Sequence, residues 1–149
     1  MSQHTDLYDT DFYVWTQAQA AALRNGKAQD LDWTNLAEEI DSLGKRDRRA
    51  LMHQLERLLM HLLTWQYHPS MRQTGSSGRQ AIRHARREMA LILNDSPSLD
   101  RQIPTQLAFA YAHARIDASD DTGLPLATFP EQCPWDVEQV LDDDFWPEG

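Results

Sequence analysis

The chain has 149 residues, 41% of them hydrophobic and 25% charged, which is enough for one globular domain with a single core. Its formal net charge of −9 argues against broad affinity for nucleic acids or for anionic membranes. The single cysteine, Cys133, excludes an intramolecular disulfide and any zinc site built from several cysteines.

Apolar residues recur mostly at spacings of three and four, which predicts an all-α protein. The first residues are polar and acidic, unlike a signal peptide, and no apolar run is long enough to span a membrane, so we expect a cytoplasmic protein with no membrane partner. The first helix should begin at Asp9 or Thr10 and end at Asn25 before Gly26. One of its faces carries Phe12, Trp15, Gln19, Ala22 and Leu23.

A second helix should begin at Asp32, which is a good N-cap and is flanked by the apolar pair Leu31 and Leu36. Its apolar stripe consists of Leu36, Ile40 and Leu43. Gly44 allows two interpretations, because glycine inside a helix costs only about 1 kcal/mol. Either one bent helix covers residues 32–67, or two helices meet at Gly44.

Pro69 should end this segment, and the Ser/Gly-rich residues 70–78 should form the most flexible loop. The next helix is expected over 79–94, with an inward face of Ile82, Ala85, Met89 and Ile92. A short helical turn over 97–102 and a longer helix over 103–121, ended by Gly123, should follow. Its core face would consist of Leu107, Ala110, Tyr111 and Ala114.

Residues 123–135 contain three prolines and should form an extended strap whose Leu124, Leu126 and Phe129 pack on the helices. Asp136 and Gln139 suit a capping box for a short last helix over 136–142. The expected fold is a single helical domain over residues 1–149. It would be a bundle of five or six helices with a Pro-rich C-terminal strap and a short last helix.

Several local motifs resemble those of a bacterial family known only as a domain of unknown function, the twenty-ninth so catalogued. The matching stretches include YDTDFY at 8–13, NLAEEI at 35–40, SPSL at 96–99 and FPEQCP at 129–134. Further matches lie at 31–33, 61–63, 65–66, 110–111, 114–115 and 122–124, so they cover nearly the whole chain. The resemblance implies an all-helical bacterial protein, and it implies no activity.

Charge is sorted along the chain. Residues 1–43 carry a net charge of −6, residues 44–94 a net charge of +7 and residues 95–149 a net charge of −10. Part of the positive charge forms a helical stripe of Arg79, Arg83, Arg86 and Arg87. Guanidinium groups so spaced suit phosphates or carboxylates. The acidic C-terminus, around residues 142–148, offers a competing partner from the same or a second chain.

Three residues form a possible polar site. His61 lies at the edge of a leucine stripe and allows two interpretations. It is either a half-buried histidine with a hydrogen bond, or a functional group that acts in acid–base chemistry or binds a metal together with an acid from another helix. Glu39 could be that acid, or it could pair with a buried arginine such as Arg115. His53 and His61 are about 12 Å apart along a helix, too far to share a metal, so we expect neither a metal nor a cofactor.

No motif of a known catalytic class occurs, so the sequence assigns no catalytic residue and leaves open whether the protein is an enzyme. We expect a protein–protein interaction or scaffold domain that self-associates, with Trp135, Phe145 and Trp146 as interface aromatics. The partner would be a second copy or another protein, and nucleic acid is not expected. One alternative is a phosphate or nucleic-acid binder that uses the stripe Arg79–Arg87. Another is a metal-dependent or acid–base enzyme centred on His61.

Overall fold

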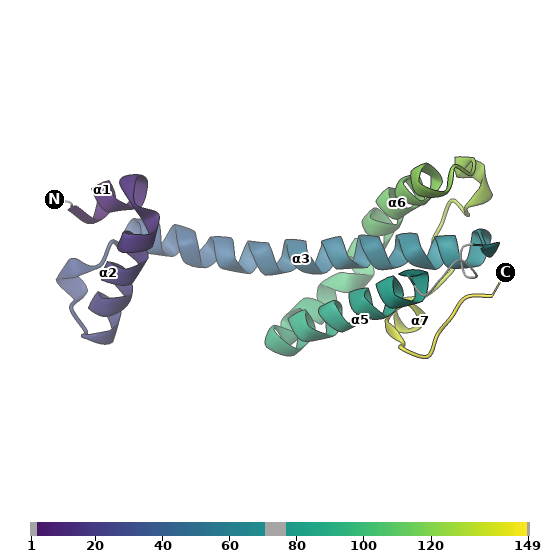
Figure 1. Ribbon diagram of the computed structural model, residues 1–149. Coiled ribbons are helices and arrows are strands. Elements are labelled where there is room, and N and C mark those ends of the chain that lie inside the picture. The colour runs from purple at the N-terminus through teal and green to yellow at the C-terminus, as the bar shows by residue number, and fades with distance from the viewer. Residues whose placement is uncertain (1–2, 71–76, 149) are drawn as a thin grey trace. The chain divides into compact units, whose positions relative to one another are not determined.

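The computed structural model describes residues 3–70 and 77–148, and Figure 1 shows their arrangement in helices, without a strand in these ranges. The helices, with η for the 3-10 type, are α1 (Gln3–Thr10), α2 (Phe12–Arg24), η1 (Ala28–Asp30), α3 (Trp33–Tyr67), α5 (Ser77–Asp95), η2 (Pro97–Gln102), α6 (Ile103–Thr122), η3 (Leu126–Thr128) and α7 (Val137–Leu141). The predicted all-α fold of five or six helices is confirmed. Of the predicted 70–78 loop, residues 71–76 lie outside the described ranges, and 77–78 are already helical.

Contacts between residues divide the chain into two compact units, Met1–Arg46 (unit 1) and Asp47–Gly149 (unit 2). The expectation of one domain over 1–149 stays a prediction. Helix α3 begins in unit 1, ends in unit 2 and is continuous through Gly44, so the interpretation as one helix is the correct one. A Cβ atom added to Gly44 would meet nothing within 4 Å, so open space surrounds this position.

Unit 1 starts with a helix, α1, that the sequence analysis did not predict. Helix α2 begins later than expected, because Asp11 rather than Asp9 or Thr10 is its N-cap and accepts a hydrogen bond from the Val14 N–H at 3.1 Å. Tyr8 of α1 packs edge-on against Phe12 and Trp15 of α2, and these ring contacts hold α1 in place.

The turn between α2 and α3 is held by two buried side chains of α2. Gln19 donates to the Asp30 carbonyl at 3.2 Å and accepts from the Asp32 N–H at 2.7 Å. Trp15 donates its indole N–H to Asp32 at 3.1 Å. Asp32 also accepts from the Asn35 N–H at 3.4 Å, which confirms the predicted cap of this helix.

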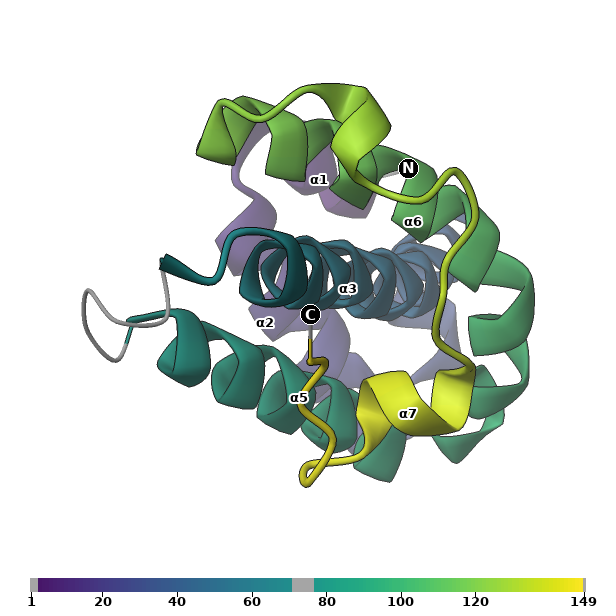
Figure 2. The ribbon, with the colours of Figure 1, turned by 90° about the vertical axis from the view of Figure 1, so that its right-hand side faces the viewer.

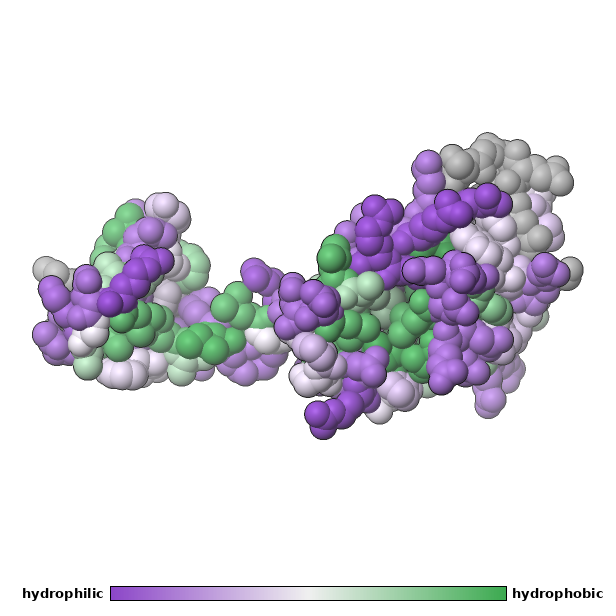
Figure 3. Space-filling view, turned by 90° about the horizontal axis from the view of Figure 1, so that it is seen from below, coloured by the Kyte–Doolittle hydropathy of each residue, from purple (hydrophilic) through white to green (hydrophobic). Residues whose placement is uncertain are grey.

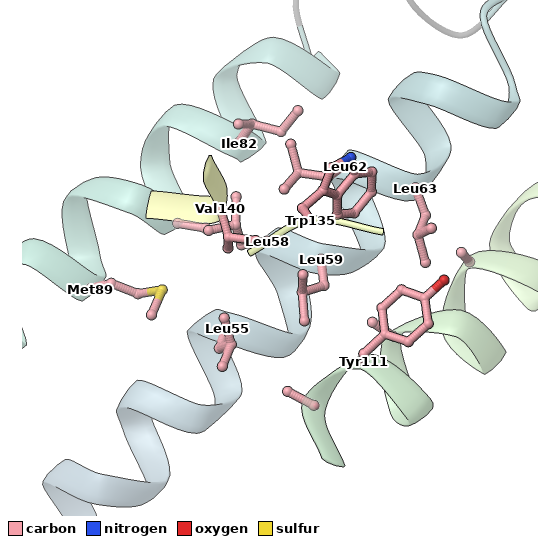
Figure 4. Packing of buried hydrophobic residues seen from close by; sticks show 14 of the residues in the cluster. Leu55, Leu58, Leu59, Leu62, Leu63, Ile82, Met89, Tyr111, Trp135 and Val140 are labelled. Atoms are coloured by element: carbon pink, nitrogen blue, oxygen red, sulfur yellow. The ribbon is translucent and has the colours of Figure 1, made fainter. Parts of the chain in front are cut away.

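In unit 2, the C-terminal half of α3 lies between α5 and α6, and α7 lies beside α5 (Figures 1 and 2). The leucine face of α3 is fully buried and consists of Leu51, Leu55, Leu58, Leu59, Leu62 and Leu63. In Figure 4, Ile82 and Met89 of α5 approach this face from one side and Tyr111 of α6 approaches it from the other. Trp135 and Val140 from the C-terminal segment close the cluster.

The predicted strap after α6 is present. Side chains of α6 hold it in place by donating hydrogen bonds to carbonyl groups of the strap. Tyr111 donates to the Pro130 carbonyl at 2.6 Å, Arg115 to the Phe129 carbonyl at 3.0 Å and Ser119 to the Leu124 carbonyl at 2.7 Å. Gly123 ends α6 with a φ of 77°, a backbone conformation that favours glycine.

Two details of the predicted C-terminal segment can be compared with the structure. The expected capping box of Asp136 and Gln139 is present at the start of α7. The expectation that Leu126 packs on the helices is wrong, since this side chain is 41% exposed. Leu126 lies in η3, and Phe129 carries the buried contact instead.

Candidate functional site

The four arginines of α5 do not form one exposed surface. Arg79, Arg83 and Arg87 are exposed, whereas Arg86 is only 3% exposed. The Nε of Arg86 donates to the Val140 carbonyl at 2.9 Å, and its Nη1 and Nη2 are buried without a hydrogen-bond partner. Burial lowers the pKa of Arg86, and the carboxylates of Asp143 and Asp142 act in the opposite direction. The prediction of a four-arginine binding stripe therefore fails at Arg86.

The C-terminal segment covers the arginine face through an aromatic ring. The guanidinium carbons of Arg79, Arg83 and Arg86 lie 5.6, 5.8 and 5.7 Å from the ring centroid of Trp146. Trp146 also packs against Trp65 of α3, with 4.9 Å between ring centroids. These are cation–π distances, so residues of the same chain already occupy the arginine face.

The three predicted interface aromatics all contribute to packing inside unit 2. Trp135 is buried, while Phe145 and Trp146 are half-buried against the core. Trp135 packs edge-on against Phe145, with 6.4 Å between ring centroids. Burial of Trp135 places its ring in the core of its own chain, so we correct its assignment as an interface anchor.

The predicted polar site of His61, Glu39 and Arg115 is not assembled by the contacts seen in either unit. In unit 1, Glu39 accepts a hydrogen bond from the Tyr8 hydroxyl, and this bond, with burial and nearby acids as lesser causes, raises the pKa of Tyr8 to about 12. In unit 2, Arg115 binds the Phe129 carbonyl. Glu39 therefore has Tyr8 as a partner within unit 1, and its pairing with Arg115 stays a prediction.

His61 is half-buried on α3. Burial lowers the pKa of His61, Arg57 lowers it further and Asp121 partly opposes the shift. Within residues 3–70 and 77–148, no three His, Cys, Asp or Glu side chains are grouped so that they could hold a metal ion. The structure thus places His61 where burial and Arg57 favour its neutral form and Asp121 favours its charged form.

A groove in unit 2 gathers polar residues of α3 and α6. It has a volume of about 350 Å³ and is lined by Arg48, Arg49, Met52, His53, Glu56 and Gln106. His113 of α6 lies 3.0 Å from Glu56 through its Nδ1. The sequence analysis did not bring these residues together, because no local pattern reports which residues of α6 face α3.

Unit 1 exposes much of its apolar surface (Figure 3). Of the side chains described there, only Trp15, Gln19 and Ala22 are buried. On α3, Trp33, Ile40 and Leu43 are 65%, 66% and 49% exposed. At 100° per residue, Trp33, Leu36, Ala37, Ile40, Leu43 and Gly44 fall within about 120° of one another, and we call this face the α3 seam. The predicted stripe therefore exists as an uncovered surface.

The helices and these surfaces define an all-α protein. Its chain belongs to the family described as Domain of unknown function DUF29, whose model matches residues 7–146. The resemblance stated from the local motifs is thereby confirmed. None of the curated proteins and none of the solved structures compared with the chain matches it. Throughout the described ranges, no helix combines the length and the apolar character needed to cross a membrane.

Proposed function

We propose that this protein is a protein–protein interaction domain that self-associates through the α3 seam. The observation that supports the proposal is the exposure of Trp33, Ile40 and Leu43 on one helical face. A unit of the size of Met1–Arg46 that buries so few side chains gains little stability from its own core. Covering three large apolar side chains would contribute about 1.5–3 kcal/mol for each one fully removed from water.

A second copy of the chain suits the seam because its charges are self-complementary. Glu38, Glu39 and Asp41 precede the middle of the seam, and Lys45 and Arg46 follow it. Glu39 and Arg46 lie about 20° apart around the helix, on the same flank of the seam. In an antiparallel pair centred near residue 42, Glu39 of each copy therefore faces Arg46 of the second copy.

The centre of such a pair also allows the two helices to approach each other closely. The same alignment sets Ile40 of one copy level with Gly44 of the other. Gly44 has open space around it and lacks a side chain, so the Ile40 side chain can approach the backbone closely. The ion pair of Lys45 with Asp41 at 3.0 Å is exposed and worth at most about 1 kcal/mol, so it does not oppose exchange between copies.

Sedimentation equilibrium over a range of concentrations tests self-association. We expect a monomer–dimer equilibrium that Ile40→Asp abolishes, because a buried charge without a partner costs several kcal/mol. Phe109→Asp is the matched control, since Phe109 is equally exposed but lies on α6 in unit 2. A monomer at all concentrations, or equal effects of the two variants, would contradict the proposal.

The orientation has a separate test. Spin labels on single cysteines, Thr34→Cys or Asp41→Cys, in a Cys133→Ser background report distances between copies. An antiparallel pair places the two Thr34 positions about 24 Å apart along the helix axis and the two Asp41 positions only about 3 Å apart. A parallel pair gives the same distance at both positions and would refute the orientation while leaving self-association intact.

The remaining functional expectations are not favoured by a specific observation. Trp146 packs on Arg79, Arg83 and Arg86, which leaves less of the arginine face for an external anion. His61 feels the charge of Asp121, and no group of three His, Cys, Asp or Glu side chains in the described ranges could hold a metal ion beside it. A cytoplasmic location stays part of the proposal.

A further inference from the structure

The groove between α3 and α6 in unit 2 combines charged and polar side chains with a partly apolar lining. Arg48, Arg49 and His53 bring donor groups from α3, and Gln106 faces them from α6. Met52 is half-buried and supplies an apolar portion of the lining. The volume of about 350 Å³ lies at the small end of the range for small-molecule sites, about 300–1,000 Å³.

The groove carries cations that the described part of the chain does not neutralise. Neither Arg48 nor Arg49 forms an ion pair in the structure as far as it is described. Glu56, the acid in the lining, has its Oε1 3.0 Å from Nδ1 of His113. Two guanidinium groups are therefore available to an external anion, and each can offer two parallel N–H donors.

The α6 side of the groove has an unsatisfied acceptor. Oε1 of Gln106 is buried and has no hydrogen-bond partner, while its Nε2 donates to Gln102 at a long 3.4 Å. A buried acceptor without a donor costs about 1–3 kcal/mol, so a ligand hydroxyl that draws the Gln106 amide toward the groove and donates to its Oε1 gains affinity. A complementary ligand therefore has an anionic group near Arg48 and Arg49 and a hydroxyl group near Gln106.

We propose that this groove binds a small phosphate monoester that also carries a hydroxyl group. The phosphate of such a molecule carries close to two negative charges at neutral pH, which balance Arg48 and Arg49. Its hydroxyl donates to Gln106, and its short carbon chain packs on Met52. The site lies on a different helix pair from the arginine face of α5 and does not depend on the proposed self-association.

Isothermal titration calorimetry with glycerol 3-phosphate tests the proposal, with inorganic phosphate and glycerol as comparison ligands. We expect glycerol 3-phosphate to bind more tightly than phosphate and glycerol not to bind. Arg48→Gln and Arg49→Gln should each weaken binding about tenfold, the loss expected for one charged hydrogen bond. Gln106→Leu should remove the preference for glycerol 3-phosphate over inorganic phosphate.

Arg57→Gln is the matched control, because Arg57 is an exposed arginine of α3 that does not line the groove. Circular dichroism should show the same helix content and melting temperature for the three arginine variants, since the replaced arginines are exposed. Absence of heat with glycerol 3-phosphate would overturn the proposal. Equal weakening by Arg57→Gln, or tighter binding of a single-stranded oligonucleotide than of the monoester, would show diffuse charge attraction and would overturn it as well.

Discussion

Removing the indole ring of Trp146 should uncouple the C-terminal segment from unit 2. Three cation–π contacts, with Arg79, Arg83 and Arg86, are worth about 0.5–1 kcal/mol each at partly exposed sites. The ring pair with Trp65 adds about 0.5–1.5 kcal/mol. The contacts share one ring and are not additive, and Arg86 would regain water once the ring is gone. Trp146→Ala should therefore lower the free energy of unfolding by about 2–3 kcal/mol.

Urea unfolding followed by circular dichroism measures this loss without relying on tryptophan fluorescence. Trp146→Phe keeps an aromatic face and should lose less than half as much. Phe109→Ala removes an exposed ring of α6 and should change stability by no more than about 0.5 kcal/mol. A loss below about 0.5 kcal/mol for Trp146→Ala would show that the ring contacts do not hold the segment, and the reasoning would be wrong.

Three further predictions concern buried or half-buried polar groups. Arg86→Met should leave the free energy of unfolding within about 1 kcal/mol of the original or raise it. The reason is that the variant removes two buried nitrogens without partners along with only one hydrogen bond. A loss above about 3 kcal/mol, measured by urea unfolding, would contradict this. Burial lowers the pKa of His61, so the unfolded chain binds its proton more readily and stability should fall as pH drops below about 6.5, by at most about 1.4 kcal/mol per pH unit. His61→Gln should flatten this slope in urea unfolding measured as a function of pH, and an unchanged slope would contradict the reasoning. Burial raises the pKa of the Cys133 thiol, so a thiol reagent at pH 8 should modify the folded protein far more slowly than the protein in urea, and equal rates would refute the assignment.

Periodicity predicted the faces of the helices well but not what covers them. Leu36, Ile40 and Leu43 follow the same spacing as Leu51 and Leu55, and only the latter pair is buried. A helical wheel shows that a stripe must be covered, either by the same chain or by another. It contains no information on which of the two applies, because the covering residues are distant in sequence.

The burial of Arg86 could have been predicted from its position in the sequence. It lies four residues after Ile82 and three before Met89, so it belongs to the inward face of α5. The prediction of one arginine stripe relied on the positive charge of Arg86 and disregarded its position on the helix.

Helix α1 was not predicted because its polar sequence lacks an apolar stripe. The ring contacts of Tyr8 with Phe12 and Trp15 stabilise it instead.

The continuity of α3 through Gly44 has a consequence for protease sensitivity. Lys45, Arg46, Arg48 and Arg49 follow the glycine directly and are all exposed. Glycine is among the weakest helix formers, and here no packed side chain prevents the helix from opening for a moment. Trypsin should therefore cleave between residues 45 and 50 before it reaches the leucine core, and it would release a stable fragment that begins near Ala50. A bound second copy would shield the same bonds.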